Sequence, residues 1–139
     1  MAALALPLAA MDSMAGHETV GLENGGPAQA ALIEEMRTLD AVFREIVSSV
    51  ALGDADGVAK AIDRMHGKKE RTEQALDSGK IRLPKHPEKT ALFRKLDGEF
   101  HAGLKMLENA ALRGDRKAMV GVTQRLIARC AGCHATFRK

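Results

Sequence analysis

The chain has 139 residues, the length of one domain, and 45 % of them are hydrophobic, so it can bury a core and is not a disordered tail. Its net charge of +3 results from 21 basic and 18 acidic residues that are interleaved along the chain, whereas a nucleic-acid-binding protein would gather its cations on one face. Aromatic residues make up only 3 %, and the abundance of helix-forming Ala, Leu, Met, Lys and Glu predicts an all-α fold.

Residues 1–27 are expected to be a leader that precedes the folded domain, which then spans residues 28–139. The apolar run 2–10 resembles the later part of a secretory signal peptide, although the basic residues that begin such signals are missing. A frayed native N-terminus is the alternative interpretation. Residues 16–27 contain four Gly and one Pro in mostly polar surroundings, which favours a loop. No stretch reaches the ~18 consecutive apolar residues of a membrane-spanning helix, so we expect a soluble mature protein with no membrane span.

Apolar residues at helical spacing predict the first two helices of the domain. From residue 28 onward they recur every three or four positions, as on the buried face of a helix in a bundle. This first series comprises Leu32, Met36, Leu39, Phe43, Ile46 and Val50. A weaker second series, which Lys69 interrupts, comprises Val58, Ile62, Met65, Thr72 and Leu76. The stretch 79–87 contains two prolines and cannot continue a helix, so it is expected to be the long connection between two halves of the domain.

Two further helices are predicted after this connection. The third series comprises Phe93, Leu96, Phe100, Leu104 and Leu107, and the fourth comprises Met119, Leu126, Cys130, Cys133 and Phe137. One Gly-Asp pair, Gly53-Asp54, separates the first helix from the second, and another, Gly114-Asp115, separates the third from the fourth. Glycine is typical just after a helix, and aspartate is typical of a helix N-cap. Two helical hairpins of this kind predict an antiparallel up-down-up-down four-helix bundle.

The segment Cys130-Ala-Gly-Cys133-His134 has the spacing of a covalent haem-attachment site. On a helix the three functional side chains occupy positions i, i+3 and i+4 and share one face. The two thiols can therefore reach the vinyl groups on one edge of a porphyrin while the imidazole reaches the iron. A thioredoxin-like dithiol is disfavoured because no strand precedes the motif, and a zinc site would lack a second cysteine pair. The motif predicts one covalently bound haem c with His134 as an iron ligand.

The position of this motif close to the end of the last predicted helix resembles the class II cytochromes c, the cytochrome c′ family. The resemblance covers residues 28–139. It is strongest in the third and fourth helices, at Phe100, Leu104, Leu107, Gly114-Asp115 and the ending from Cys130 to Arg138. It implies that His134 is the proximal iron ligand, that Phe137 packs beside it, and that Arg138 is either the basic residue near the proximal face or a solvated terminal charge. Haem attachment in this family takes place outside the bacterial cytoplasm, so the periplasm is the expected compartment.

The sixth coordination position of the iron divides this family into gas-binding members, which keep it open beneath an apolar residue, and electron carriers, in which a Met fills it. Met36 is 17 residues before Gly53, about 26 Å along its helix, and Cys130 is 16 residues after Gly114, about 24 Å along its own. Met36 is therefore the candidate distal ligand, and Leu32 over an open site is the competitor. A Met on a helical face is also often plain core. The Arg that the family usually has four residues before the distal residue is missing for both candidates.

The remaining expectations concern other histidines, function and partners. His66 and His101 lie beside their apolar series and are expected at the boundary or surface, with contact to haem as the alternative.

The main hypothesis is a periplasmic one-electron carrier that works with a redox partner protein. The second is a five-coordinate protein that binds nitric oxide or carbon monoxide, while an enzyme is not expected because no acid-base pair is evident near the predicted distal side. The family resemblance also suggests a homodimer through the first two helices.

Overall fold

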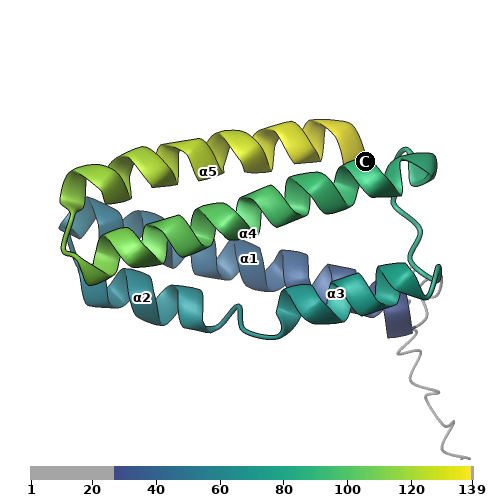
Figure 1. The fold of residues 1–139 in the computed structure, drawn as a ribbon, viewed down its shortest axis with the longest axis horizontal. Helices are drawn as coiled ribbons and strands as arrows, with labels where there is room; N and C mark the ends of the chain where they lie inside the picture. The colour runs from purple at the N-terminus through teal and green to yellow at the C-terminus, as the bar shows by residue number, and fades with distance from the viewer. Residues whose placement is uncertain (1–26, 139) are drawn as a thin grey trace, which may run out of the picture.

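The computed structural model describes residues 27–138, and all regular secondary structure in this part of the chain is helical, as the sequence predicts (Figure 1). Its elements are α1 (Pro27–Leu52), α2 (Ala55–Asp63), α3 (Lys68–Asp77), the short 3-10 helix η1 (Pro87–Lys89), α4 (Thr90–Leu112) and α5 (Arg116–Phe137). The predicted leader and signal segment lies outside the described residues. None of the helices within residues 27–138 is long and apolar enough to cross a membrane.

Both predicted Gly-Asp turns are present and have the expected geometry. Gly53 and Gly114 adopt left-handed backbone angles, with φ of 72° and 64°, which cost a glycine little because it has no Cβ. Asp54 and Asp115 each cap the following helix, since each carboxylate accepts a 2.9 Å hydrogen bond from the backbone N–H three residues later. The two turns lie at the same end of the molecule, and the C-terminus lies at the other (Figure 1).

The second predicted helix is wrong in one respect, because the chain forms two helices there. α2 ends at Asp63 and α3 begins at Lys68, with a turn between them in which Gly67 has a φ of 73°. A glycine in this conformation interrupts the helical hydrogen-bond series and lets the chain change direction slightly. The predicted apolar face is confirmed nevertheless, and its buried members are Val58, Ile62, Met65, Thr72 and Leu76.

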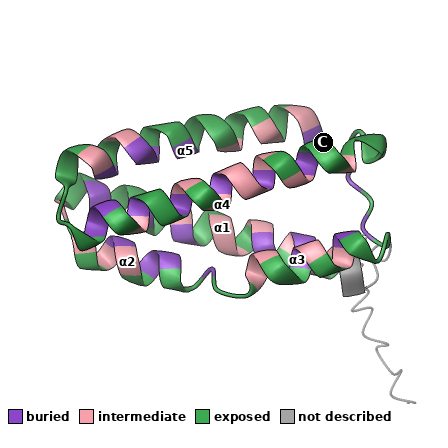
Figure 2. Cartoon of the chain, in the orientation of Figure 1, coloured by how far each residue is buried: buried purple, intermediate pink, exposed green. Residues whose placement is uncertain are grey.

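The buried apolar residues form two clusters, and Figure 2 shows buried positions on α1, α2, α4 and α5. The larger cluster, which we call the main core, is built from α1, α2, α4 and α5 and includes Val42, Ile46, Val58, Phe100, Leu104, Leu107, Met119 and Leu126. α4 and α5 approach closely there, since a Cβ at Gly103 would lie 2.7 Å from the Leu126 side chain. The smaller cluster, which we call the distal-end core, consists of Leu32, Leu76, Ile81, Leu83, Phe93 and Phe137.

The connection between α3 and η1 belongs to the core, which the sequence did not indicate. Ile81 and Leu83 are buried, with exposed fractions of 8 % and 3 %. The backbone N–H of Arg82 donates to the Gln29 side chain of α1 at 3.1 Å, and a second backbone N–H in this connection donates to the carbonyl of Phe137 at 3.2 Å. The connection is thereby held against the start of α1 and the end of α5.

Candidate cofactor site

The two cysteines and the histidine of the haem-attachment motif lie on the last turns of α5. Cys130 and Cys133 are half-buried free thiols, and His134 is exposed. Cys130 packs against the main core, whereas Cys133 packs one turn further along against the distal-end core. The helix therefore presents the donors in sequence order along one side, as the i, i+3, i+4 spacing predicts.

A pocket of about 680 Å³ opens between α1 and α5 beside this motif. Six of the seven predicted site residues line it, namely Leu32, Met36, Cys133, His134, Phe137 and Arg138. Cys130 is the exception, since it lies deeper along the helix against the main core. The fold thus brings the first and last helices together around the residues that the sequence selected.

The walls of the pocket are largely apolar, and two of the apolar residues come from segments that the sequence did not assign to the site. Leu83, from the connection before η1, and Phe93, from α4, both line the pocket and are buried. Phe93 packs edge to face on Phe137, with ring centroids 5.6 Å apart and planes at 87°. This pair fixes the end of α5 just beyond His134. The only available signal was that Phe93 shares a helical face with other apolar residues.

The rim of the pocket carries charged side chains of α1 that were also missed. Arg37, Asp40 and Arg44 line this edge, and the guanidinium of Arg44 pairs with the carboxylate of Asp40 at 2.9 Å in an exposed ion pair. The sequence has no arginine four residues before either candidate distal residue. The structure places arginines after Met36 at the same mouth, one at the next position and one two turns later.

The height estimate for Met36 is correct only to within about one helical turn. Counting from the Gly-Asp turns pairs Met36 with Cys130, but in the structure Met36 packs in the distal-end core together with Cys133. Leu32, one turn further out, is buried in the same cluster and lines the same pocket. Helices that cross at an angle do not keep equal heights, so a residue count has this error. Both candidates for the distal position therefore face the motif.

Partial burial of the two thiols favours their protonated form. Burial raises the pKa of Cys130 above its ordinary value, and burial together with the nearby carboxylate of Asp97 raises the pKa of Cys133. A reactive dithiol needs the opposite, a lowered pKa that favours the thiolate. The surroundings of the two thiols therefore do not activate them as a redox dithiol requires.

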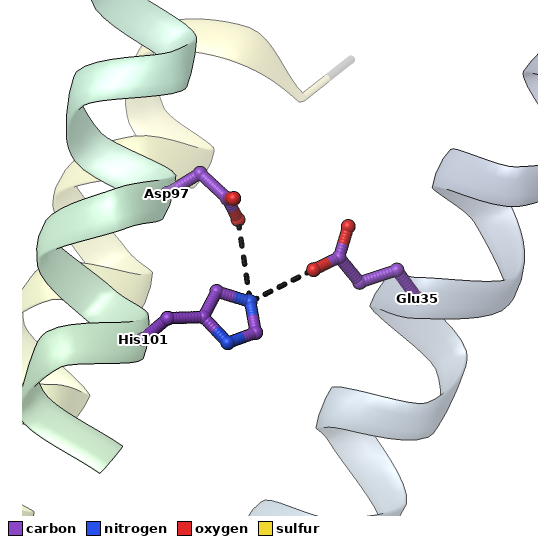
Figure 3. Close-up of side chains that lie close together, drawn as sticks. All are labelled: Glu35, Asp97 and His101. Carbon is purple, nitrogen blue, oxygen red and sulfur yellow. Dashed lines mark hydrogen bonds and ion pairs between the residues drawn. The ribbon is translucent and has the colours of Figure 1, made fainter. Parts of the chain in front are cut away.

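Neither His66 nor His101 lines the pocket. His66 is exposed in the turn between α2 and α3 and pairs with Asp63 at 3.0 Å, as predicted for a surface residue. His101 is more enclosed than expected, with 14 % of its side chain exposed, and its Nε2 atom lies 2.8 Å from Oε1 of the fully buried Glu35. Asp97 is the third member of this buried polar cluster, with its Oδ1 atom 3.7 Å from the same nitrogen (Figure 3).

Sequence reasoning missed both carboxylates of this cluster, although a signal existed. Glu35 and Asp97 occupy positions on the buried faces of α1 and α4, three residues after Leu32 and four residues after Phe93. A charged residue at such a position is rarely buried unless it has a partner. Burial, with the Glu35 carboxylate as a second cause, raises the pKa of Asp97 to about 6, while His101 acts in the opposite direction.

Comparisons with protein-family models, with curated proteins and with solved structures found no match for this chain.

Proposed function

We propose that this protein is a periplasmic mono-haem c-type cytochrome of the class II type that transfers single electrons. Cys130 and Cys133 would bind the haem covalently, and His134 would be its proximal iron ligand. The observation that carries the proposal is the pocket of about 680 Å³, which Cys133 and His134 of the attachment motif line together with Met36 of α1. The attachment motif supplies the chemistry, and the pocket supplies space beside it.

The residues present fit a haem. Leu32, Leu83, Phe93 and Phe137 give the pocket the apolar walls that a porphyrin face requires and would exclude water from it. The arginines at the rim would meet the two propionate carboxylates of the cofactor, which need cations or water. A bound haem would supply a one-electron redox centre, and the protein would hold it, limit its solvation and set its potential.

Met36 is the distal residue that we propose for this electron carrier. Its thioether lines the pocket from the helix that faces α5, and a Met ligand raises the potential of a haem relative to weaker distal partners. The second candidate function is reversible binding of nitric oxide or carbon monoxide at an open iron. The observation in its favour is Leu32, which is 6 % exposed and lines the same pocket, so that it could cover an empty distal position.

The proposal includes an up-down-up-down four-helix bundle, in which α2 and α3 together form the second arm. This arrangement accounts for the two Gly-Asp turns at one end of the molecule. A redox partner protein and a homodimer through α1 and the α2–α3 arm follow from the family resemblance, and the rim of the pocket is where a redox partner would come nearest to the cofactor.

The test is intact mass spectrometry of the protein after export in a host with haem-attachment machinery. The expected mass exceeds that of the polypeptide by one haem, and the haem stays with the protein during acid-acetone extraction. The variant Cys130→Ala with Cys133→Ala is the control and should lose the added mass. A chain that carries no haem, or haem that extracts freely from the unmutated protein, would overturn the proposal.

A further inference from the structure

A buried cluster of two carboxylates and one imidazole joins α1 to α4, apart from the pocket-lining residues. Figure 3 shows Asp97 and His101 projecting from α4 toward Glu35 on α1. The Nε2 atom of His101 lies 2.8 Å from Glu35 Oε1 and 3.7 Å from Asp97 Oδ1. One ligand atom from each residue lies within 4.8 Å of the other two. Three donors of the types that bind transition metals therefore converge on one point.

The carboxylate of Glu35 is not fully hydrogen-bonded. Its side chain is fully buried, with an exposed fraction of 0 %. The second oxygen, Oε2, has no hydrogen-bond partner among the described residues. A buried carboxylate oxygen without a partner is costly, and such an atom in a native protein calls for an ion or another group to satisfy it. This oxygen belongs to the same carboxylate that faces His101.

The charge around the cluster also favours a cation. Glu35 and Asp97 together carry two negative charges when both are ionised. A protonated His101 would cancel one of them, whereas a His101 that binds a metal ion is neutral. Lys69 acts electrostatically on Asp97 from α3, but its ammonium group forms an ion pair with Glu73. The pair has no net charge, so the lysine does not neutralise the two carboxylates. A divalent ion would match their charge.

We propose that Glu35, Asp97 and His101 bind a divalent transition-metal ion, with zinc as the reference ion. One imidazole nitrogen and two carboxylate oxygens are ligands that zinc accepts, and manganese and iron bind similar sets. Zinc bonds of about 2.0–2.2 Å place tetrahedral ligands roughly 3.3 Å apart, and the observed separations of 2.8 and 3.7 Å lie on either side of that value. Asp97 and His101 share a helical face of α4 at i and i+4, and Glu35 comes from α1.

The three ligands of this site do not line the proposed haem pocket, although the Asp97 carboxylate is close enough to Cys133 to raise the pKa of its thiol. Glu35 nevertheless directly precedes Met36 on α1. A metal bound between α1 and α4 would therefore fix the helix that carries the proposed distal residue.

The experiment is a zinc titration of the exported full chain by isothermal calorimetry after removal of metals with EDTA, together with metal analysis after dialysis. We expect one tightly held zinc per chain and a rise in melting temperature with zinc concentration. Glu35→Gln and His101→Gln should each weaken zinc binding by at least about tenfold, since each removes a ligand. His66→Gln is the matched control, because His66 also pairs with a carboxylate but lies at the surface.

Two outcomes would overturn the proposal, namely no zinc uptake by the unmutated chain, or equal affinity in the unmutated chain and in Glu35→Gln. Circular dichroism verifies that each variant is folded, and Asp97→Asn replaces any variant that is not. In the haem-loaded protein both thiols are consumed in thioether bonds and cannot bind zinc, so zinc bound by that protein supports the cluster. Zinc that binds only to the haem-free chain, and does so independently of Glu35, counts against it. The haem mass is read separately, so the two proposals can fail independently.

Discussion

Met36 of α1 and His134 of α5 line the same pocket, although they come from the first and last helices of the domain. The pocket therefore has a candidate iron ligand on each of two facing helices. An imidazole and a thioether in this arrangement are the axial ligands typical of electron-transferring c-type cytochromes. This relationship motivates the first prediction.

Replacement of Met36 by Ala should convert the iron from low-spin to high-spin. The unmutated ferric protein should show the weak long-wavelength absorption band of sulfur ligation, and the variant should lose it. Carbon monoxide should bind to the ferrous variant at least about tenfold faster, a barrier decrease of ~1.4 kcal/mol, since no ligand has to leave first. Electron paramagnetic resonance and stopped-flow spectroscopy measure these changes.

Met106→Ala is the control for this prediction, because Met106 is 56 % exposed on α4 and does not line the pocket. Its spectrum should match that of the unmutated protein. A high-spin, five-coordinate iron in the unmutated protein would contradict Met36 ligation and favour the gas-binding alternative, with Leu32 over the open position.

Loss of the haem should destabilise the whole domain. Without it the apolar walls of the pocket between α1 and α5 would face water, and apolar surface exposed to water costs free energy in proportion to its area. We expect the Cys130→Ala, Cys133→Ala variant to lose helical content and at least ~2–5 kcal/mol of unfolding free energy, the range of a large core truncation. Circular dichroism with thermal and urea denaturation measures both. Equal stability with and without haem would argue against a buried cofactor.

Phe93→Ala should weaken both the fold and the pocket. Phe93 is 4 % exposed and packs edge to face on Phe137, so truncation should cost about 3–5 kcal/mol. Its neighbour Leu92 is 39 % exposed, and Leu92→Ala should cost less than about 1 kcal/mol. Urea denaturation of the haem-loaded proteins measures the difference. Similar losses in the two variants would show that Phe93 has no special role in closing the pocket.

Most of the fold could be predicted from the sequence because the helical signals are local. The Gly53-Asp54 turn illustrates this, since a left-handed glycine and a capping aspartate act within one helical turn. The break at Gly67 was not predicted because a glycine within an apolar helical series often stays helical. Burial of Leu83 was not predicted either, because it depends on contacts between the connection and helices far away in sequence.

The candidate site likewise has one part that the sequence predicts and another that it does not. Cys130, Cys133 and His134 have a fixed spacing that their chemistry requires, so they can be recognised without a structure. The side chains around Met36 come from several elements, and a count along the helices locates them only to about one turn. Burial of Glu35 was hidden because a glutamate on a helix is usually solvated, and only the approach of the His101 side chain from α4 reveals its partner.

The stability of the metal-free protein should depend on pH through the Asp97 carboxyl. Burial is the main cause that raises the pKa of Asp97 from 3.8 to about 6; the carboxylates of Glu35 and Glu73 add to the effect, and His101 and Lys69 oppose it. The unfolded chain releases this proton near its ordinary pKa, so between about pH 4 and 6 the folded state binds more protons. The contribution of Asp97 to the unfolding free energy should therefore fall as pH rises through this window, by roughly 3 kcal/mol, and remain constant above it.

Asp97→Asn keeps the shape of the side chain and removes its titration, so the variant should lose less stability than the unmutated protein between pH 4 and pH 7. Urea denaturation at a series of pH values in EDTA, so that no metal occupies the cluster, measures the unfolding free energy of both proteins. Asp63→Asn is the control, because the Asp63 side chain is 77 % exposed beside His66, and its pH profile should follow that of the unmutated protein. If the Asp97→Asn profile does so as well, the Asp97 carboxyl does not titrate differently in the folded and unfolded states.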